Sequence, residues 1–257
     1  LASGSFDLPP RFVEKNYLGI GLIAKMSPRN GYNPLLNLAH HWLRQTPSPI
    51  SLPVLSVRDT TMIKSIDQQK WNHRYSEEPD LRETEPSDLL RQVLRVKAPE
   101  GPVLELACGI SGNALALAEM GRKVLAVDIS DVALGYLSAE AEKRGTSERI
   151  SCVQADLATW RPPRSQCYAL VISVMFWDPV VFDYASRAVD QEGVLAWQAF
   201  AAGQVRYRPS IRPELCLGSG EPASMLTKEY RVIHEQDVDD GHRVYRQMIA
   251  RRGRDHV

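Results

Sequence analysis

Short apolar runs repeat along the chain from about residue 66 onward, and each is followed by a mixed segment with helical spacing. The alternation predicts buried strands joined by helices. We therefore expect an α/β protein with a doubly wound, mostly parallel seven-stranded sheet, a Rossmann-like fold that ends in an antiparallel hairpin. The predicted strands cover residues 103–107, 124–127, 150–154, 169–175 and 194–200, and the hairpin strands lie near 231–236 and 243–250.

Helix start and stop signals support this division. Ser87 opens a helix with apolar positions at 89, 90, 93 and 94, and Ser130 with Asp131 opens another. Gly121 and Gly145 follow the ends of two predicted helices, where glycine commonly terminates the helical conformation. The pattern therefore predicts five successive βα repeats before the hairpin.

Residues 1–61 lack this regularity. They hold seven of the 17 prolines and only three acids against six Lys or Arg residues. Three interpretations stay open: an irregular or disordered extension, upstream sequence outside the native product with Met62 as its start, or an acid-poor targeting segment. The expected organisation is an extension over 1–61 and one domain over 62–257.

Composition narrows the function classes. The chain is 44% hydrophobic and 24% charged, with a net charge of zero, which is typical of a globular protein. It gives no electrostatic reason to expect a nucleic acid or an anionic membrane as partner. The four cysteines form no CxxC pair and have no histidine at metal-ligand spacing, so we expect free thiols, a cytoplasmic location and no metal site. The oligomeric state stays open.

Candidate chemistry gathers where the first two predicted strands end. The carboxylates of Glu105 and Asp128 flank a turn of small residues that includes Ala107 and Gly109. Ligands of open α/β sheets lie beyond the carboxyl ends of the strands. A carboxylate at position 128 suits the two hydroxyls of a ribose, although capping of the next helix is the simpler alternative.

The next two strand ends extend this site. Asp156, after the third strand, suits an exocyclic amine, while the amide of Leu157 suits the neighbouring ring nitrogen of an adenine. Ser173 ends the fourth strand. The predicted nucleoside-binding edge of the sheet is thus completed by Asp156, Leu157 and Ser173.

The turn also separates two cofactor classes. A pyrophosphate needs the full G-x-G-x-x-G pattern, in which backbone amides approach the anion. In Ala107-Cys-Gly-Ile-Ser-Gly112 only Gly109 stands in its expected place, and Glu105 repels a pyrophosphate. The pattern favours a phosphate-free adenosine cofactor whose ammonium group Glu105 holds directly or through water.

These segments together resemble the class I S-adenosylmethionine-dependent methyltransferases, over about residues 67–257. The layouts around Trp71-x-x-Arg-Tyr75 and Ser173–Asp178 look most like the small-molecule branch near the tellurite-resistance and thiopurine methyltransferases. The resemblance implies S-adenosyl-L-methionine as cofactor and methyl transfer to a small molecule by in-line displacement. It implies that the methionine end contacts Glu105, Ala107 and Gly109, the ribose Asp128 and Ile129, and the adenine Asp156 and Leu157.

Two positions depart from that family, which usually has glycine where this chain has Ala107 and Ser111.

The acceptor is expected to contact Trp71, Tyr75, Trp177 and Arg206. For two of them a simpler interpretation exists: Trp177 packs in the core, and Arg206 lies on a solvated surface. No catalytic residue is assigned, because an activated sulfonium needs mainly alignment and desolvation. Two other functions stay open: a catalytically silent nucleoside-binding or partner domain, and an NAD-dependent dehydrogenase.

Overall fold

The computed structural model describes residues 65–77 and 84–253. Their strands form one mixed sheet in the order β3-β2-β1-β4-β5-β8-β7, and the short β6 pairs with β5. The seven predicted strands are confirmed, and the two-residue β6 makes an eighth. The strands are β1 Val103–Leu106, β2 Val124–Asp128, β3 Ile150–Gln154, β4 Tyr168–Val174, β5 Val189–Ala201, β6 Cys216–Leu217, β7 Tyr230–Asp239 and β8 Val244–Arg252.

Strand direction places the candidate residues at one edge. Strands β1 to β5 run parallel to one another, and β8 runs antiparallel to both β5 and β7. The carboxyl ends of the parallel strands therefore lie at the same edge of the sheet. The start of β8 reaches this edge too, because Tyr245 pairs with Phe200 and Gln247 with Gln198. The predicted C-terminal hairpin is confirmed.

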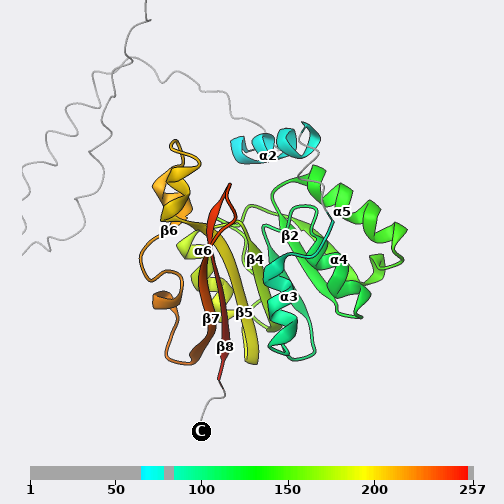
Figure 1. The fold of residues 1–257 in the computed structure, drawn as a ribbon. Helices are drawn as coiled ribbons and strands as arrows, with labels where there is room; N and C mark the ends of the chain where they lie inside the picture. The colour runs from blue at the N-terminus through cyan, green and yellow to red at the C-terminus, as the bar shows by residue number, and fades with distance from the viewer. Residues whose placement is uncertain (1–64, 78–83, 254–257) are drawn as a thin grey trace, which may run out of the picture. The chain divides into compact units, whose positions relative to one another are not determined.

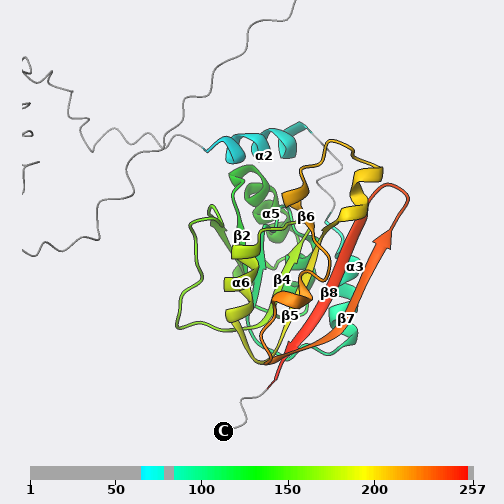
Figure 2. The ribbon, with the colours of Figure 1, turned by 90° about the vertical axis from the view of Figure 1, so that its left-hand side faces the viewer.

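Helices cover both faces of the sheet, as a doubly wound fold requires (Figure 1). One apolar cluster joins α3, α4 and α5 to one face, and a second joins α6 to the other. Helix α2 lies across the carboxyl edge of the parallel strands in both views (Figure 2). The helices are α2 Ile66–Glu77, α3 Asp88–Arg95, α4 Gly112–Glu119, α5 Asp131–Lys143 and α6 Pro179–Arg187.

The expected helix ends are largely confirmed. The hydroxyls of Ser87 and Ser130 accept hydrogen bonds from the amides of Leu90 and Ala133, respectively. Gly121 and Gly145 have positive φ angles just beyond α4 and α5. These caps satisfy amides and carbonyls that a helix end otherwise leaves unpaired.

The prediction of five βα repeats was wrong. Residues 155–167, between β3 and β4, contain turns and no helix. Pro162 and Pro163 explain this, because proline lacks the amide that a helix interior needs. After β5 the chain forms only short 3-10 helices before β6.

Residues 1–61, predicted to form an extension, lie outside the described residues, so the domain boundary stays a prediction. Within residues 65–77 and 84–253, no helix has the length and apolarity needed to span a membrane.

Candidate cofactor-binding site

The turn after β1 has the tight backbone that its small residues predict. Ala107 and Gly109 adopt positive φ angles of 50° and 57°. A side chain on Gly109 would collide with the hydroxyl of Tyr75 from α2, so this position tolerates only glycine while α2 is in place. Ala107 holds the same class of backbone conformation with a methyl group, at some cost in strain.

Asp128 ties this turn to the end of β2. One carboxylate oxygen accepts a hydrogen bond from the Gly109 amide at 2.8 Å, and the other accepts from the Ser130 amide at 2.8 Å. The side chain is only 6% exposed, and burial raises the pKa of its carboxyl. An ionised carboxylate offers about four acceptor positions, and the Gly109 and Ser130 amides occupy two of them.

Glu105 forms the centre of a buried polar network. Its carboxylate oxygens accept from the Ser111 hydroxyl at 2.5 Å and from the Asn113 side-chain amide at 3.1 Å. Asn113 in turn accepts from the Ser87 amide, so the network joins β1 to the first turns of α4 and α3. Burial is the main cause that raises the pKa of Glu105 to about 7, because no solvent surrounds the carboxylate to stabilise its charge.

Helix α2 is fastened to the start of α5. Asn72 accepts from the Ser130 hydroxyl at 2.7 Å and donates to Asp131 at 2.7 Å, and Gln68 donates to Asp131 at 3.0 Å. This contact holds Tyr75 over the turn beside Asp128, and burial there raises the pKa of the Tyr75 hydroxyl well above its usual range. The Trp71 ring lies 5.9 Å from the Tyr75 ring.

A cavity of about 190 Å³ lies beside this turn. Its wall includes Glu105, Ala107, Gly109 and Tyr75, and it also includes Val174 at the end of β4. The cavity therefore brings together the three residues predicted for the methionine end and one residue predicted for the acceptor. The predicted ribose and adenine residues lie outside its wall.

The remaining predicted nucleoside residues follow β2 and β3. Ile129 is half-buried, Asp156 is exposed and Leu157 is buried. Asp156 accepts from the Ala158 amide at 2.9 Å. Arg161 closes the same loop by donating to the Leu157 and Trp160 carbonyls. The loop is thus ordered by its own bonds, and its contact with an adenine stays a prediction.

Ser173 and Trp177 have structural roles instead of facing the cavity. The fully buried Ser173 hydroxyl donates to the Leu106 carbonyl at 3.0 Å, which fastens β4 to the end of β1. Trp177 is 7% exposed and packs against Phe182 of α6, which favours the simpler core interpretation, and its expected acceptor contact stays a prediction. Its apolar ring gains more from this packing than from exposure.

Arg206 likewise follows the simpler interpretation. Its guanidinium pairs with Asp239 of the hairpin at 2.8 Å, and its side chain is 61% exposed. Nearby, buried Gln204 accepts from the Val244 amide and fixes the chain after β5. An acceptor contact for Arg206 stays a prediction.

Three site residues escaped the sequence analysis. Ser111 and Asn113 hold Glu105, and Asn72 anchors α2. Ser111 was visible as a departure from glycine, but its helix-capping hydroxyl, which accepts from the Ala114 amide, also explains its presence. Asn72 carries no local signal, because its partners are about 58 residues away along the chain.

Comparison with known proteins bears on the choice between the cofactor classes. Residues 103–193 match the sequence model of a family described as a methyltransferase domain. This segment is therefore similar to a methyltransferase domain. It contains both strand-end carboxylates and the turn between them, so the resemblance drawn from these residues is confirmed. No curated protein sequence matches the chain.

Solved structures of methyltransferases and of a cyclase share the fold of this chain. TehB from Haemophilus influenzae is 17% identical with a TM-score of 0.53, over 64% of this chain and 61% of that one. Magnesium protoporphyrin IX methyltransferase from Synechocystis PCC 6803, with bound SAM, is 15% identical with a TM-score of 0.50, over 73% and 83%. The [4+2]-cyclase SpnF is 15% identical with a TM-score of 0.51, over 64% and 80%. At these identities the likeness establishes the fold alone.

Proposed function

We propose that this protein transfers the methyl group of S-adenosyl-L-methionine to a small-molecule acceptor. The observation that carries the proposal is the pairing of a buried Glu105 with a turn that lacks the dinucleotide glycines, inside a segment that matches a methyltransferase domain. A buried carboxylate at this place suits an ammonium group and opposes a pyrophosphate.

The donor set fits that cofactor. Glu105 is the acceptor for its ammonium, and Asp128 is the acceptor for the ribose hydroxyls beside the two amides it already binds. Asp156 and Leu157 take the adenine edge. When bound, the cofactor supplies a methyl group already activated by the positive charge on sulfur. The task of the protein is then to align the acceptor and to exclude water.

Helix α2 controls access in this proposal. Tyr75 lies against Gly109, and α2 is bonded to Ser130 and Asp131, directly beside Asp128. A cavity of about 190 Å³ is too small for a whole adenosyl cofactor, since ligand pockets are typically 300–1,000 Å³. Because α2 also lies over the turn beside Asp128, we infer that α2 moves when the nucleoside enters.

Loosening α2 is expected to speed cofactor entry. Asn72→Ala removes the contacts to Ser130 and Asp131 and should raise the association rate of S-adenosylhomocysteine about fivefold in stopped-flow mixing; this corresponds to about 1 kcal/mol of lost hydrogen bonding. His73→Ala, on an exposed position of the same helix, is the matched control and should leave the rate unchanged. Equal rates in all three proteins would contradict a covering role for α2.

The function itself is tested by calorimetry with S-adenosylhomocysteine and with NAD, followed by turnover of labelled S-adenosylmethionine against thiols, amines and carboxylates. Binding of S-adenosylhomocysteine alone, with methyl transfer to one acceptor class, supports the proposal. NAD binding contradicts it. Cofactor binding without any methyl transfer favours the silent domain or another reaction, as the shared fold of the cyclase SpnF allows.

The setting of the reaction is also proposed. The described cysteines Cys108, Cys152, Cys167 and Cys216 are all free thiols, which supports a reducing compartment such as the cytoplasm.

A further inference from the structure

A row of side-chain amides crosses the face of the sheet that α3 covers. Gln92 of α3 donates to Gln247 of β8 at 2.8 Å, Gln247 donates to Gln198 of β5 at 2.8 Å, and Gln198 donates to the sulfur of Met175 at 3.2 Å. We call these four residues the glutamine relay. Gln198 is 8% exposed and Gln247 is 2% exposed, so the relay runs through the protein interior.

The fold does not require this polarity. On the same face of β5 and β8, Val194, Ala196 and Ile249 pack in an apolar cluster with α3. Apolar side chains at positions 198 and 247 would extend that cluster without burying amides, which is costly unless every group is bonded. Sites at which a chain departs from its own burial pattern are commonly functional.

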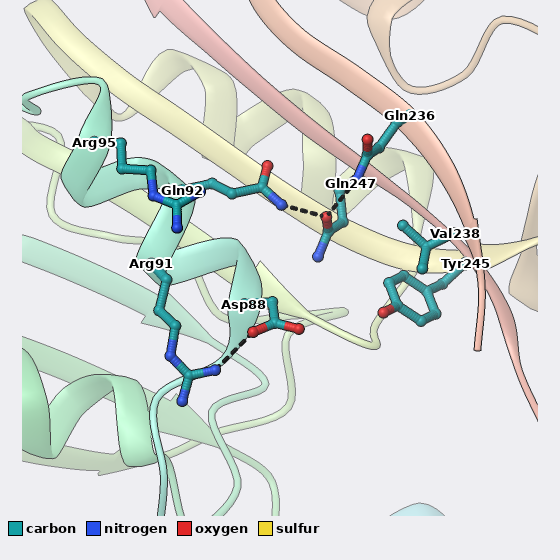
Figure 3. Close-up of a pocket in the computed structure, with 8 residues that line it drawn as sticks. All are labelled: Asp88, Arg91, Gln92, Arg95, Gln236, Val238, Tyr245 and Gln247. Carbon is teal, nitrogen blue, oxygen red and sulfur yellow. Dashed lines mark hydrogen bonds and ion pairs between the residues drawn. The ribbon is translucent and has the colours of Figure 1, made fainter.

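The outer end of the relay opens into a polar cleft of about 180 Å³ between α3 and the hairpin (Figure 3). In this view Gln92 reaches across from α3 to Gln247, and the Tyr245 hydroxyl points toward α3. Gln236 of β7 also contributes its amide to the wall. The cleft therefore presents hydroxyl and amide groups from both sides.

The charge of the cleft favours an anion. Its wall holds Asp88, Arg91 and Arg95 as charged groups, for a net charge of +1. Asp88 pairs with Arg91 at 2.6 Å, whereas none of the ion pairs within residues 65–77 and 84–253 includes Arg95. An unpaired guanidinium beside neutral amide donors suits one carboxylate or phosphate group.

The inner end of the relay lies at the candidate active site. Gln198 pairs with Val174 across β4 and β5, and Val174 lines the cofactor cavity. Met175, which follows Val174, has a φ of 61° and donates its amide to the Gln198 carbonyl at 2.7 Å. The glutamine relay thus connects the cleft to the backbone at the end of β4.

We propose that the cleft between α3 and the hairpin binds a small molecule through one carboxylate or phosphate group, and that the glutamine relay transmits this binding to Met175. This site is separate from the cofactor cavity, and the test of anion binding to it does not depend on the proposed methyl transfer. A methyl acceptor with an anionic group and an anionic effector share this chemistry.

Nuclear magnetic resonance on the full chain tests the binding. Inorganic phosphate and acetate are titrated separately against chloride at equal ionic strength, while the side-chain amide signals of Gln92 and Gln236 are followed. We expect saturable shifts with either probe, and at least fivefold weaker binding in Arg95→Gln. Arg187→Gln, an exposed arginine on α6 across the sheet, is the matched control and should bind as the wild type does. Shifts that do not saturate, or equal affinity in Arg95→Gln, overturn the site.

The same titration tests the relay through the methyl signal of Met175. In the wild type the Met175 methyl signal should shift together with the glutamine signals. In Gln198→Met the Met175 signal should not shift, while the affinity of the cleft for the anion remains within about twofold of the wild-type value. A still Met175 signal in the wild type, or an unaltered shift in Gln198→Met, overturns transmission through the relay.

Turnover measured with and without phosphate identifies the natural source of the anionic group. If the ligand is the methyl acceptor, phosphate competes with the acceptor found in the turnover panel. If it is an effector, phosphate changes turnover without competition. Normal S-adenosylhomocysteine affinity in Arg95→Gln shows that a failure of the cleft is not a failure of the cofactor site.

Discussion

Asp128→Ala lowers the affinity for S-adenosylhomocysteine by at least 100-fold in our expectation. The substitution removes the carboxylate proposed to accept from both ribose hydroxyls. Hydrogen bonds to a charged group contribute about 1.5–3 kcal/mol each, so losing two costs at least about 3 kcal/mol of binding free energy. Isothermal titration calorimetry at pH 7.5 measures the change directly.

The same substitution also frees the amides of Gly109 and Ser130, which Asp128 holds in the described structure. We therefore expect a loss of stability of about 2 kcal/mol, measured by urea unfolding. Asp128→Asn keeps an acceptor oxygen for one amide and separates the two effects, since it should fold better than the alanine variant and still bind weakly. Asp183→Ala, at an exposed position on α6, is the control. Wild-type affinity in a folded Asp128→Asn protein would refute the ribose contact.

Glu105→Gln is expected to remove a pH dependence from the stability of the protein. In the unfolded chain this carboxyl loses its proton near pH 4.5, whereas burial in the native state raises its pKa to about 7. Between these two values the native state binds the extra proton, so wild-type stability falls as the pH rises. The fall from this group amounts to about 3 kcal/mol between pH 4.5 and 7.

Urea unfolding of both proteins at pH 5 and pH 8 measures the difference. The glutamine variant should show the smaller loss of stability between the two values, although Asp128, whose pKa is also raised, still contributes in both proteins. Parallel curves for the two proteins would mean that Glu105 does not carry the proton.

Cofactor binding should displace that proton. A bound ammonium favours the ionised form of Glu105. As the pH rises toward 7, the affinity for S-adenosylhomocysteine should therefore increase by up to about tenfold per pH unit, and it should level off above pH 7. Calorimetry in buffers of different ionisation enthalpy should detect proton release at pH 6 in the wild type and less of it in Glu105→Gln. Equal proton release in both proteins would place the ammonium elsewhere.

Local patterns in the sequence were sufficient to predict the sheet and the strand-end acids. The strand predicted at 124–127 is a short apolar run with Asp128 directly after it, and Glu105 lies near the end of the run at 103–107, so backbone direction alone places both acids at one edge. The class of cofactor followed from the missing glycines beside Gly109.

Contacts between distant segments could not be predicted in the same way. The core position of Trp177 depends on its packing against Phe182, and the pairing of Arg206 depends on Asp239 in the hairpin. The cover formed by α2 depends on Asn72 meeting Ser130, and no periodicity in either segment signals that encounter. The absence of a helix between β3 and β4 is signalled locally, by the adjacent Pro162 and Pro163.

The place of Trp71 on α2 has a practical consequence. Its half-buried ring lies 5.0 Å from the Arg74 guanidinium and next to Tyr75, whereas Trp177 and Trp197 are enclosed in the core. Displacement of α2 would change the surroundings of Trp71 and leave those two indoles as they are. Intrinsic fluorescence thus offers a label-free optical signal for the opening of the cover in real time.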